Sequence, residues 1–574
     1  MKIALAQQNY HIGNFEENTR KIIMATKEAE KQGADLVVFS ELSLCGYPPR
    51  DFLEFEDFIN KCYKAIDEVA SHTARIGVIV GCPVRNPVKE GKDLFNAAWL
   101  LYQHKVHGIV RKTLLPTYDV FDEYRYFEPA YEWKCVEFKG VNIALTICED
   151  IWNLGDAPLY RICPMDKLIL QRPDIMINIS ASPFDFDHDD DRKEIIRANV
   201  LKYHLPMFYC NAIGSQTEVV FDGGSMVIDA GGCIITEMKY FEEDFTITEV
   251  PSTNRNKSQP DQHIQVNEKQ LPDKSMRVSK INEPEAIIGY LTGKKNIEEI
   301  HKALILGIRD YFSKMGFTKA ILGSSGGIDS AVTLVLACEA LGKENVRAIL
   351  MPSPFSSDHS VSDAEILSRN LGNHYDIIPI SEMYNASISS LKPVFADLPF
   401  NLAEENIQSR IRGNLLMAIA NKFNLILLNT SNKSELATGY GTLYGDMAGG
   451  LSVLGDVYKM QVYALARHLN TIADFIPVSI LTKVPSAELR PGQKDSDSLP
   501  DYEVLDKILY QYIERRQGPG EITNMGLDAA LVKRVLKMVN TNEYKRNQFC
   551  PIIRVSAKAF GIGRRMPIVG KYLS

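Results

Sequence analysis

Apolar and polar positions alternate with two different periods over residues 1–250. Glu16–Gln32 and Phe55–Ser71 repeat apolar side chains every three or four positions, as amphipathic helices do. Shorter apolar runs predict β-strands, and paired glycines after Asp222 and near Asp229 predict hairpins within residues 219–235. The pattern indicates a mixed α/β domain rich in sheet, with strands at 36–39, 76–80, 97–102, 143–147, 175–179 and 207–210.

Residues 251–284 are polar and show neither period, which is typical of a connection between domains. From residue 285 onwards, apolar runs and helical patterns alternate again. This alternation predicts a doubly wound parallel sheet, whose ligands bind at the carboxyl ends of its strands. We therefore expect domains at 1–250 and 285–574; in the second, strands fall at 320–322, 346–351 and 425–428, and helices at 297–315, 330–341, 360–371 and 406–423.

Composition narrows the class of protein. The chain has 574 residues, of which 45% are hydrophobic and 24% charged, as is usual for globular proteins. Its apolar runs fall short of the ~20 residues that span a bilayer, and a net charge of −8 argues against a nucleic-acid partner. The ten cysteines lack zinc-finger spacing, and Met1–Gln7 is typical of a strand rather than an export signal. We expect a cytoplasmic protein with reduced thiols.

The stretch Gly323-Ser324-Ser325-Gly326-Gly327-Ile328-Asp329-Ser330 joins a predicted strand to a predicted helix. A glycine-rich turn in this position lets backbone N–H groups surround phosphate oxygens, where the helix dipole favours negative charge. No Lys-Ser/Thr pair follows, so this is not a Walker A loop, and the dinucleotide glycine spacing is absent. The serines can bind phosphate and Asp329 can hold Mg²⁺, although an ordinary Gly/Ser turn is the alternative. The stretch resembles the SGGxDS loop of ATP pyrophosphatases.

A second polar segment, residues 429–435, follows the strand expected at 425–428. Thr430 can touch the nucleotide, and Glu435 can join Asp329 on Mg²⁺, because hard cations prefer carboxylate oxygens. The alternative is simply the capped start of a helix.

Three further features suit a ligand-binding domain. The glycine-rich residues 440–450 suit a loop that lies close to a ligand, and the polar stretch 485–495 suits a lid. Arg410 and Arg412, and the basic segments near 544–546 and 563–565, can meet an anionic substrate or can equally form solvated faces.

In the first domain, Glu41, Lys112 and Cys148 each follow an apolar run. Strand ends of one sheet can converge, so a carboxylate, an ammonium and a thiol can share a pocket. Such a set performs acyl transfer, in which Glu41 accepts the thiol proton, Cys148 attacks a carbonyl and Lys112 stabilises the oxyanion. We also expect the lysine to lower the pKa of the thiol. Taken singly, each residue is more often structural.

The segments Phe39-Ser40-Glu41-Leu42, Lys112-Thr113-Leu114-Leu115-Pro116 and Cys148-Glu149-Asp150-Ile151-Trp152 resemble the Glu-Lys-Cys triad of the nitrilase (carbon–nitrogen hydrolase) superfamily. The resemblance covers the first domain and implies an αββα sandwich. Glutaminases of this superfamily usually carry Lys or Arg six residues after Ser182, where this chain has a histidine. The resemblance implies a glutamine site formed by Tyr118, Glu123, Ser182 and His188.

Almost all of residues 285–574 resembles the synthetase domain of the NAD⁺ synthetase family, and the order of the two domains is that of its glutamine-dependent members. The resemblance implies amidation of deamido-NAD⁺ through an acyl-adenylate, with ATP, Mg²⁺ and ammonia that is released from L-glutamine and passed between sites of a homo-oligomer. It implies ATP contacts at Gly323 to Ser330, Thr430 and Lys459, and deamido-NAD⁺ contacts at Asn406, Arg410, Glu435 and Lys545.

Two other classes remain open on the sequence. One is a glutamine-dependent ligase with the same ATP loop and another acyl acceptor, similar to GMP synthetases or tRNA-modifying enzymes. The other is a sensor or scaffold that keeps the folds without the chemistry. The nitrilase-type domain argues against the first class, and the intact catalytic positions argue against the second.

Overall fold

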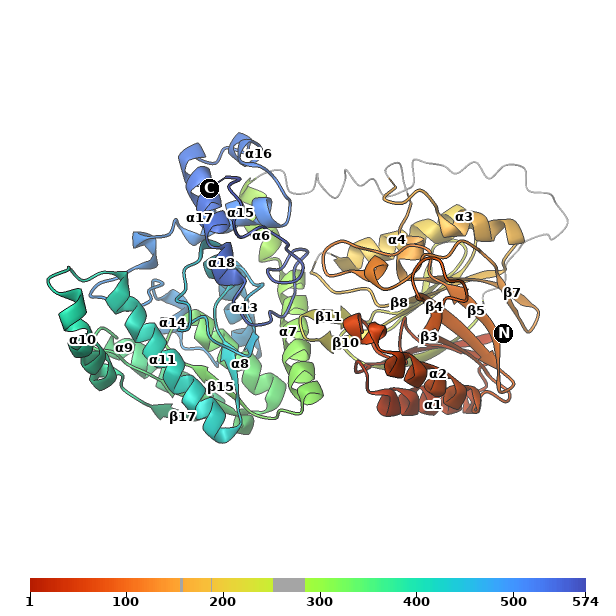
Figure 1. The fold of residues 1–574 in the computed structure, drawn as a ribbon, viewed down its shortest axis with the longest axis horizontal. Helices are drawn as coiled ribbons and strands as arrows, with labels where there is room; N and C mark the ends of the chain where they lie inside the picture. The colour runs from red at the N-terminus through yellow and green to blue at the C-terminus, as the bar shows by residue number, and fades with distance from the viewer. Residues whose placement is uncertain (155–157, 187, 251–283, 574) are drawn as a thin grey trace. The chain divides into compact units, whose positions relative to one another are not determined.

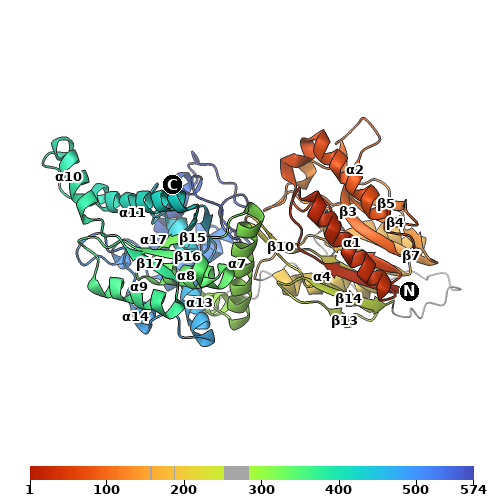
Figure 2. The same ribbon diagram turned by 90° about the horizontal axis from the view of Figure 1, so that it is seen from below.

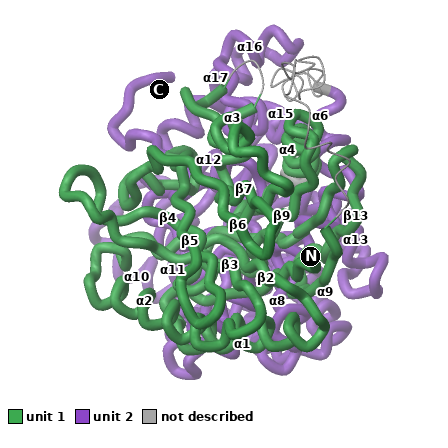
Figure 3. The backbone as a smooth tube through the Cα atoms, turned by 90° about the vertical axis from the view of Figure 1, so that its right-hand side faces the viewer, with its two compact units in different colours: residues 1–277 green, residues 278–574 purple. Residues whose placement is uncertain are grey.

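The computed structural model describes residues 1–154, 158–186, 188–250 and 284–573 (Figure 1). The chain divides into two compact units, residues 1–277 and 278–574, which Figure 3 colours separately. The predicted connection at 251–284 lies, apart from its last residue, outside the described residues.

The first unit contains two six-stranded sheets that pack face to face. Isoleucine, leucine and valine side chains from both sheets form one buried cluster, in which Ile3 and Ile79 pack with Ile143 and Ile177. The sheet orders are β14-β1-β2-β3-β4-β5 and β13-β12-β9-β8-β7-β6. The strands are β1 Lys2–Gln7, β2 Leu36–Val38, β3 Gly77–Arg85, β4 Leu94–Tyr102, β5 Lys105–Arg111, β6 Val136–Phe138, β7 Val141–Ile147, β8 Ile175–Ser180, β9 Met207–Asn211, β12 Met226–Ile228, β13 Ile234–Glu237 and β14 Asp244–Glu249.

Helices cover the outer face of each sheet. The amphipathic helices α1 (Phe15–Lys31) and α2 (Glu56–Ala70) bury their apolar faces against the first sheet. Helices α3 (Pro164–Leu168) and α4 (His188–Tyr203) cover the second sheet. This arrangement is the αββα sandwich that the sequence predicts, completed by the hairpin β10 (Ile213–Gln216) and β11 (Val219–Asp222).

The second unit is built on a five-stranded parallel sheet with the order β17-β16-β15-β18-β19. Helices α8 and α9 lie on one face of this sheet and α11 on the other (Figure 2), which confirms the predicted doubly wound fold. Within the described residues, no helix is both long and apolar enough to cross a membrane. The strands are β15 Ala320–Gly323, β16 Val346–Leu350, β17 His374–Ile377, β18 Ile426–Asn429 and β19 Leu451–Ser452; the helices are α6 Pro284–Leu291, α7 Lys294–Met315, α8 Ile328–Leu341, α9 Asp358–Leu371, α10 Ser381–Phe395, α11 Leu402–Phe423, α12 Lys433–Thr438, α13 Lys459–Ile472, α14 Val478–Thr482, α15 Tyr502–Ile513, α16 Pro519–Asn524, α17 Ala529–Thr541 and α18 Glu543–Arg546.

Gly81 in β3 provides a direct test of the packing around the segment that follows β2. A Cβ atom at this position would lie 2.2 Å from the backbone nitrogen of Leu42 and 2.7 Å from the carbonyl oxygen of Ser40. Because backbone atoms cannot move aside as side chains do, we expect Gly81→Ala to lower the free energy of unfolding by about 1–3 kcal/mol.

Chemical denaturation measures this change. The control is Gly289→Ala in α6, where a Cβ atom would meet nothing within 4 Å. Equal denaturation midpoints for the two variants would contradict the predicted close packing of residues 40–42 on β3.

Two candidate active sites

The first site lies at strand ends of the first unit, and its members are almost completely buried. Glu41 follows β2, Lys112 directly follows β5, and Cys148 directly follows β7 as the first residue of a 3₁₀ turn, Cys148–Ile151. Their exposed fractions are 1%, 0% and 4%. Lys112 Nζ lies 2.7 Å from Glu41 Oε1. The structure therefore brings together residues that stand far apart in the sequence.

In this site the ammonium of Lys112 forms ion pairs with two carboxylates. Lys112 Nζ also lies 2.8 Å from Glu123 Oε1, and Tyr47 donates a hydrogen bond of 2.8 Å to the same oxygen. Asn96 Nδ2 donates to Glu41 Oε1 at 2.6 Å and to Glu123 Oε2 at 3.3 Å. Burial raises the pKa of Glu123 to about 7, although the lysine opposes this shift. The site therefore contains a carboxyl group, that of Glu123, that can gain or lose a proton near neutral pH.

The folded chain raises the pKa of the Cys148 thiol, contrary to our expectation from the sequence that it would be lowered. Burial raises the pKa of Cys148 well above its ordinary value, and the Glu41 carboxylate raises it further. Lys112 acts in the expected direction but does not outweigh these two effects. The cysteine also has a φ of +43°, a left-handed conformation that is unfavourable for a residue with a side chain. A neighbouring base must therefore remove the thiol proton before Cys148 can act as a nucleophile.

Asp150 ties the lysine segment to the cysteine segment. Its Oδ1 accepts hydrogen bonds from the backbone nitrogens of Thr113 (3.0 Å) and Leu114 (2.9 Å), directly after Lys112. Its Oδ2 accepts one from Ile147 (3.1 Å), directly before the cysteine. This buried carboxylate fixes the positions of the Lys112 and Cys148 segments relative to each other.

The residues predicted to bind glutamine have different surroundings. Glu123 belongs to the network around Lys112. Tyr118 donates to both carboxylate oxygens of Glu149, at 3.0 and 2.9 Å, so it lies beside the residue that follows Cys148. Ser182 is buried, and its backbone nitrogen donates to an asparagine side chain. His188 begins α4, and its side chain is outside the described part of the chain.

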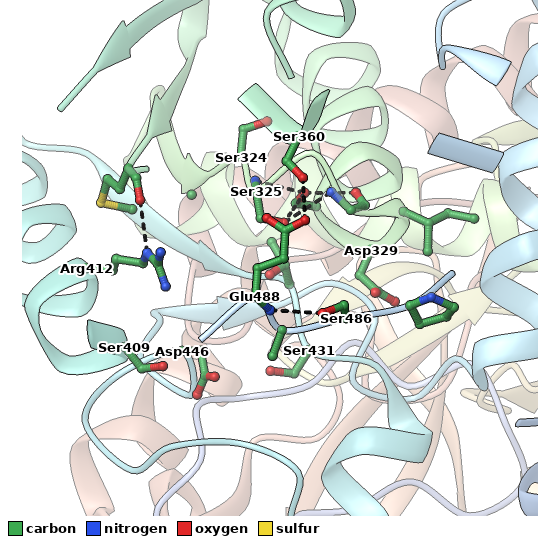
Figure 4. A pocket seen from close by; sticks show the side chains of 18 of the residues that line it. Ser324, Ser325, Asp329, Ser360, Ser409, Arg412, Ser431, Asp446, Ser486 and Glu488 are labelled. Carbon is green, nitrogen blue, oxygen red and sulfur yellow. Dashed lines mark hydrogen bonds between the residues drawn. The ribbon is translucent and has the colours of Figure 1, made fainter. Parts of the chain in front are cut away.

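The second site is a cavity of about 290 Å³ at the carboxyl ends of β15, β16 and β18 (Figure 4). Within the phosphate-loop stretch Gly323–Ser330, every residue except Gly326 lines it, together with Thr430, Glu435 and Lys459. Gly326 does not line the cavity but determines the shape of the loop. Its φ is +74°, and a Cβ atom there would lie 2.1 Å from the carbonyl oxygen of Ser360. Only glycine fits this turn of the loop.

In the cavity, too, one ammonium, that of Lys459, forms ion pairs with two carboxylates. Lys459 Nζ lies 2.5 Å from Asp329 Oδ2 and 3.4 Å from Glu435 Oε1. Asn432 Nδ2 donates to the other oxygen of Asp329 at 2.8 Å. Burial and the neighbouring Asp329 raise the pKa of Glu435 to about 8. Both carboxylates therefore face one point, which the ammonium of Lys459 occupies.

The residues predicted to contact deamido-NAD⁺, other than Glu435, lie elsewhere. Asn406, Arg410 and Lys545 do not line the cavity, and each binds the loop of residues 439–443. Arg412 lines the cavity in place of Arg410, and its Nε donates to the Met351 carbonyl at 3.1 Å. The loop contacts are Thr442 Oγ1 to Asn406 Oδ1 (2.6 Å), Arg410 Nε to the Leu443 carbonyl (3.3 Å), and Lys545 Nζ to the carbonyls of Gly439 (2.7 Å) and Gly441 (2.8 Å).

Two arginines of the predicted basic segments lie in the interior of the second unit rather than on its surface. Arg546 and Arg564 are both buried, and both pair with Glu543, at 2.7 and 2.6 Å. Both guanidiniums are therefore engaged within the fold, although one carboxylate balances only one of the two charges.

Comparison with known proteins identifies both units. The family model for carbon-nitrogen hydrolases matches residues 2–256, and that for NAD synthases matches residues 300–549. A glutamine-dependent NAD(+) synthetase from Synechocystis sp. is 44% identical over 580 residues, which covers 99% of this chain and 98% of that protein. One from Thermotoga maritima is 42% identical over 581 residues, which covers 100% and 99%.

A solved structure agrees with this result. The glutamine-dependent NAD+ synthetase from Acinetobacter baumannii, in complex with adenosine diphosphate, is 35% identical, with a TM-score of 0.73 and coverage of 100% of this chain and 99% of that one.

The folds and the matches define a carbon-nitrogen hydrolase unit followed by an NAD synthase unit. The identity extends over the full length of both units. The chain belongs to the family of glutamine-dependent NAD(+) synthetases, and the predicted resemblance of its two domains to carbon–nitrogen hydrolases and NAD⁺ synthetases is confirmed.

The reactivity of Cys148 can be tested without any substrate. Because the thiol is buried and its pKa is raised, we expect iodoacetamide to modify Cys148 slowly at pH 7 and faster as the pH rises. Peptide mass spectrometry at several pH values measures the rate, with the exposed Cys233 as an internal reference. Alkylation of Cys148 at pH 7 as fast as that of Cys233 would show that the resting thiol is already ionised.

Proposed function

We propose that this protein converts deamido-NAD⁺ to NAD⁺, using ATP and the amide nitrogen of L-glutamine. The observation that carries the proposal is the pairing of two sites in one chain. One is a buried carboxylate–ammonium–thiol set in a carbon-nitrogen hydrolase fold, and the other is a phosphate-loop cavity in an NAD synthase fold. The first suits release of ammonia and the second suits its capture.

In the first unit, Glu41 accepts the thiol proton and the sulfur of Cys148 attacks the amide carbon of glutamine. Lys112 donates hydrogen bonds to the oxyanion that forms. When the tetrahedral species collapses, the C–N bond breaks, ammonia leaves with the proton held by Glu41, and a glutamyl thioester remains. Water then cleaves the thioester to give glutamate and the free thiol. Asp150 keeps the lysine and cysteine segments in register through these steps.

In the second unit, a nicotinate carboxylate oxygen of deamido-NAD⁺ attacks the α-phosphorus of ATP and pyrophosphate leaves. Ammonia then attacks the acyl carbon of this acyl-adenylate and AMP leaves. The serines and backbone of residues 323–330 bind the phosphates, and Lys459 and Thr430 contact the nucleotide. Asp329 and Glu435 are the residues that would hold a Mg²⁺ ion, because both carboxylates line this cavity and hard cations prefer carboxylate oxygens. Such an ion neutralises charge on the phosphates.

Ammonia must travel unprotonated, because most of it becomes ammonium in water at pH 7 and ammonium is not a nucleophile. We infer that a sheltered passage connects the two sites. We also infer that the protein is a homo-oligomer, with Asn406, Arg410, Glu435 and Lys545 near the dinucleotide and Tyr118, Glu123, Ser182 and His188 near glutamine.

Nitrogen-donor specificity tests the proposal. Purified protein is assayed for NAD⁺ formation from deamido-NAD⁺, ATP and Mg²⁺, with either glutamine or ammonium chloride as the nitrogen source. We expect Cys148→Ala to lower the glutamine-driven rate by at least about 1,000-fold, because the nucleophile is lost, and to keep the ammonium-driven rate. Cys233→Ala, which removes an exposed thiol of the same unit, is the control.

Two outcomes would contradict the proposal. If the wild type forms no NAD⁺ from either nitrogen source, the acyl acceptor is a different molecule, and xanthosine monophosphate is the first alternative to assay. If Cys148→Ala keeps its glutamine-driven rate, the thiol is not the source of ammonia.

A further inference from the structure

Glu488 lines the second cavity, and its carboxylate accepts several hydrogen bonds there. Its Oε1 accepts from the hydroxyls of Ser357 (3.0 Å) and Ser360 (2.7 Å) and from Lys483 Nζ (2.9 Å). Its Oε2 accepts from the backbone nitrogen of Ser357 at 3.2 Å. We call Ser357, Ser360 and Lys483 the Glu488 cradle. It consists of a backbone N–H, two hydroxyls and an ammonium, all directed at one anion.

The cradle has the chemistry of a phosphate site. Ser357 is the N-cap of the 14-residue helix α9, so the positive end of the helix dipole faces the bound anion. Hydroxyls, a helix N-terminus and a lysine are the groups with which proteins commonly hold phosphate. In this structure they hold a carboxylate of the protein itself.

The cradle and the phosphate loop belong to one cavity. Ser360, Lys483 and Glu488 line the same space as Ser324 and Ser325 of the loop, and Figure 4 shows Glu488 next to both serines and Ser360. The close approach of Gly326 to the carbonyl of Ser360 joins the loop directly to the start of α9. A triphosphate that begins at the loop therefore has the cradle within the same cavity.

A second observation indicates a missing ligand. The hydroxyl oxygen of Ser324 is buried and forms no hydrogen bond with any described residue, while the residue itself is 4% exposed. Buried hydroxyls nearly always have a partner, so this group is left for a molecule that enters the cavity.

The backbone of Glu488 is held in an unfavourable conformation. Its φ is +49°, in the left-handed region that residues with a side chain rarely adopt. Its carboxylate contacts and a hydrogen bond from its backbone nitrogen to Ser486 Oγ (3.1 Å) accompany this conformation. An anion that replaces the carboxylate would free Glu488 to leave this conformation, while Lys483 stays in the cradle.

We propose that Glu488 is an internal substitute for the β- and γ-phosphates of ATP, and that these phosphates displace it from the cradle. The proposal rests on the proposed function, because it takes ATP as the nucleotide. After the α–β phosphate bond has been cleaved, the returning carboxylate competes with pyrophosphate and favours its release. Glu488 is thus a positioning residue that selects against nucleotides without a β-phosphate.

Binding of inorganic pyrophosphate tests this role separately from catalysis. Calorimetric titration in the presence of Mg²⁺ compares the wild type, Glu488→Gln and Glu382→Gln. Glu382 is an exposed glutamate at the start of α10, so its variant controls for the change in net charge. AMP, which carries only an α-phosphate, is the second ligand.

We expect Glu488→Gln to bind pyrophosphate at least about fivefold more tightly, because a competing state of the site is weakened. The affinity for AMP stays the same in this variant, and Glu382→Gln binds both ligands like the wild type. Pyrophosphate binding that is unchanged or weaker would show that Glu488 only anchors its segment. Tighter binding of both ligands would show a general charge effect. Either of these two results overturns the proposal.

Two further points keep the test decisive. If Glu488→Gln melts well below the wild type, Glu488→Asp replaces it, since a shorter carboxylate reaches the cradle poorly and predicts the same gain in affinity. A wild type that binds neither pyrophosphate nor ATP would instead contradict the proposed function itself.

Discussion

Each site of this protein depends on one buried ammonium that is shared by two carboxylates, both buried in the first site and partly buried in the second. Lys112 lies between Glu41 and Glu123 in the first unit, and Lys459 lies between Asp329 and Glu435 in the second. Taking these charges out of water is costly, and only their close mutual contacts offset the cost. Removal of either lysine would leave two neighbouring carboxylates without their shared counter-ion, so both lysines are required for the structure of their sites.

The same arrangement explains why the sites are chemically poised. The pKa of Glu123 is raised to about 7 and that of Glu435 to about 8, mainly by burial. The second carboxylate of each site raises these pKa values further, because two carboxylates and one ammonium leave one surplus negative charge. In the proposed mechanism the first site uses this surplus to accept the thiol proton of Cys148. The second uses it to attract a divalent cation. A third lysine, Lys433, is also shared by two buried carboxylates, Asp456 and Glu514.

The sequence predicts the fold and the centre of each site because those features are local. Hydrophobic periods predict many of the strands and helices, and Lys112 and Cys148 each directly follow an apolar run that forms a strand. Other elements were not predicted: the strands β5 and β14 and the helix α4 are among them, and the short strands β6 and β19 have too few residues to show a period.

Contacts between distant segments could not be predicted. Asn96 is one polar residue within an apolar strand, and only the pairing of strands shows that it joins Glu41 to Glu123. The raised pKa of the Cys148 thiol depends on how completely the folded chain buries it. Glu488 lies in the stretch predicted as a lid. Its hydrogen bonds with Ser357 at the start of α9 could not be predicted, because the two residues are 131 positions apart in the sequence.

The most direct test of the account is to follow the amide nitrogen of glutamine. The protein is given glutamine labelled with ¹⁵N at its amide, together with deamido-NAD⁺, ATP, Mg²⁺ and an excess of unlabelled ammonium, and the NAD⁺ formed is analysed by mass spectrometry. The account predicts that NAD⁺ carries the label despite the excess, because ammonia passes from Cys148 to the acyl-adenylate without mixing with solvent. Unlabelled NAD⁺ would contradict a sheltered transfer between the two sites.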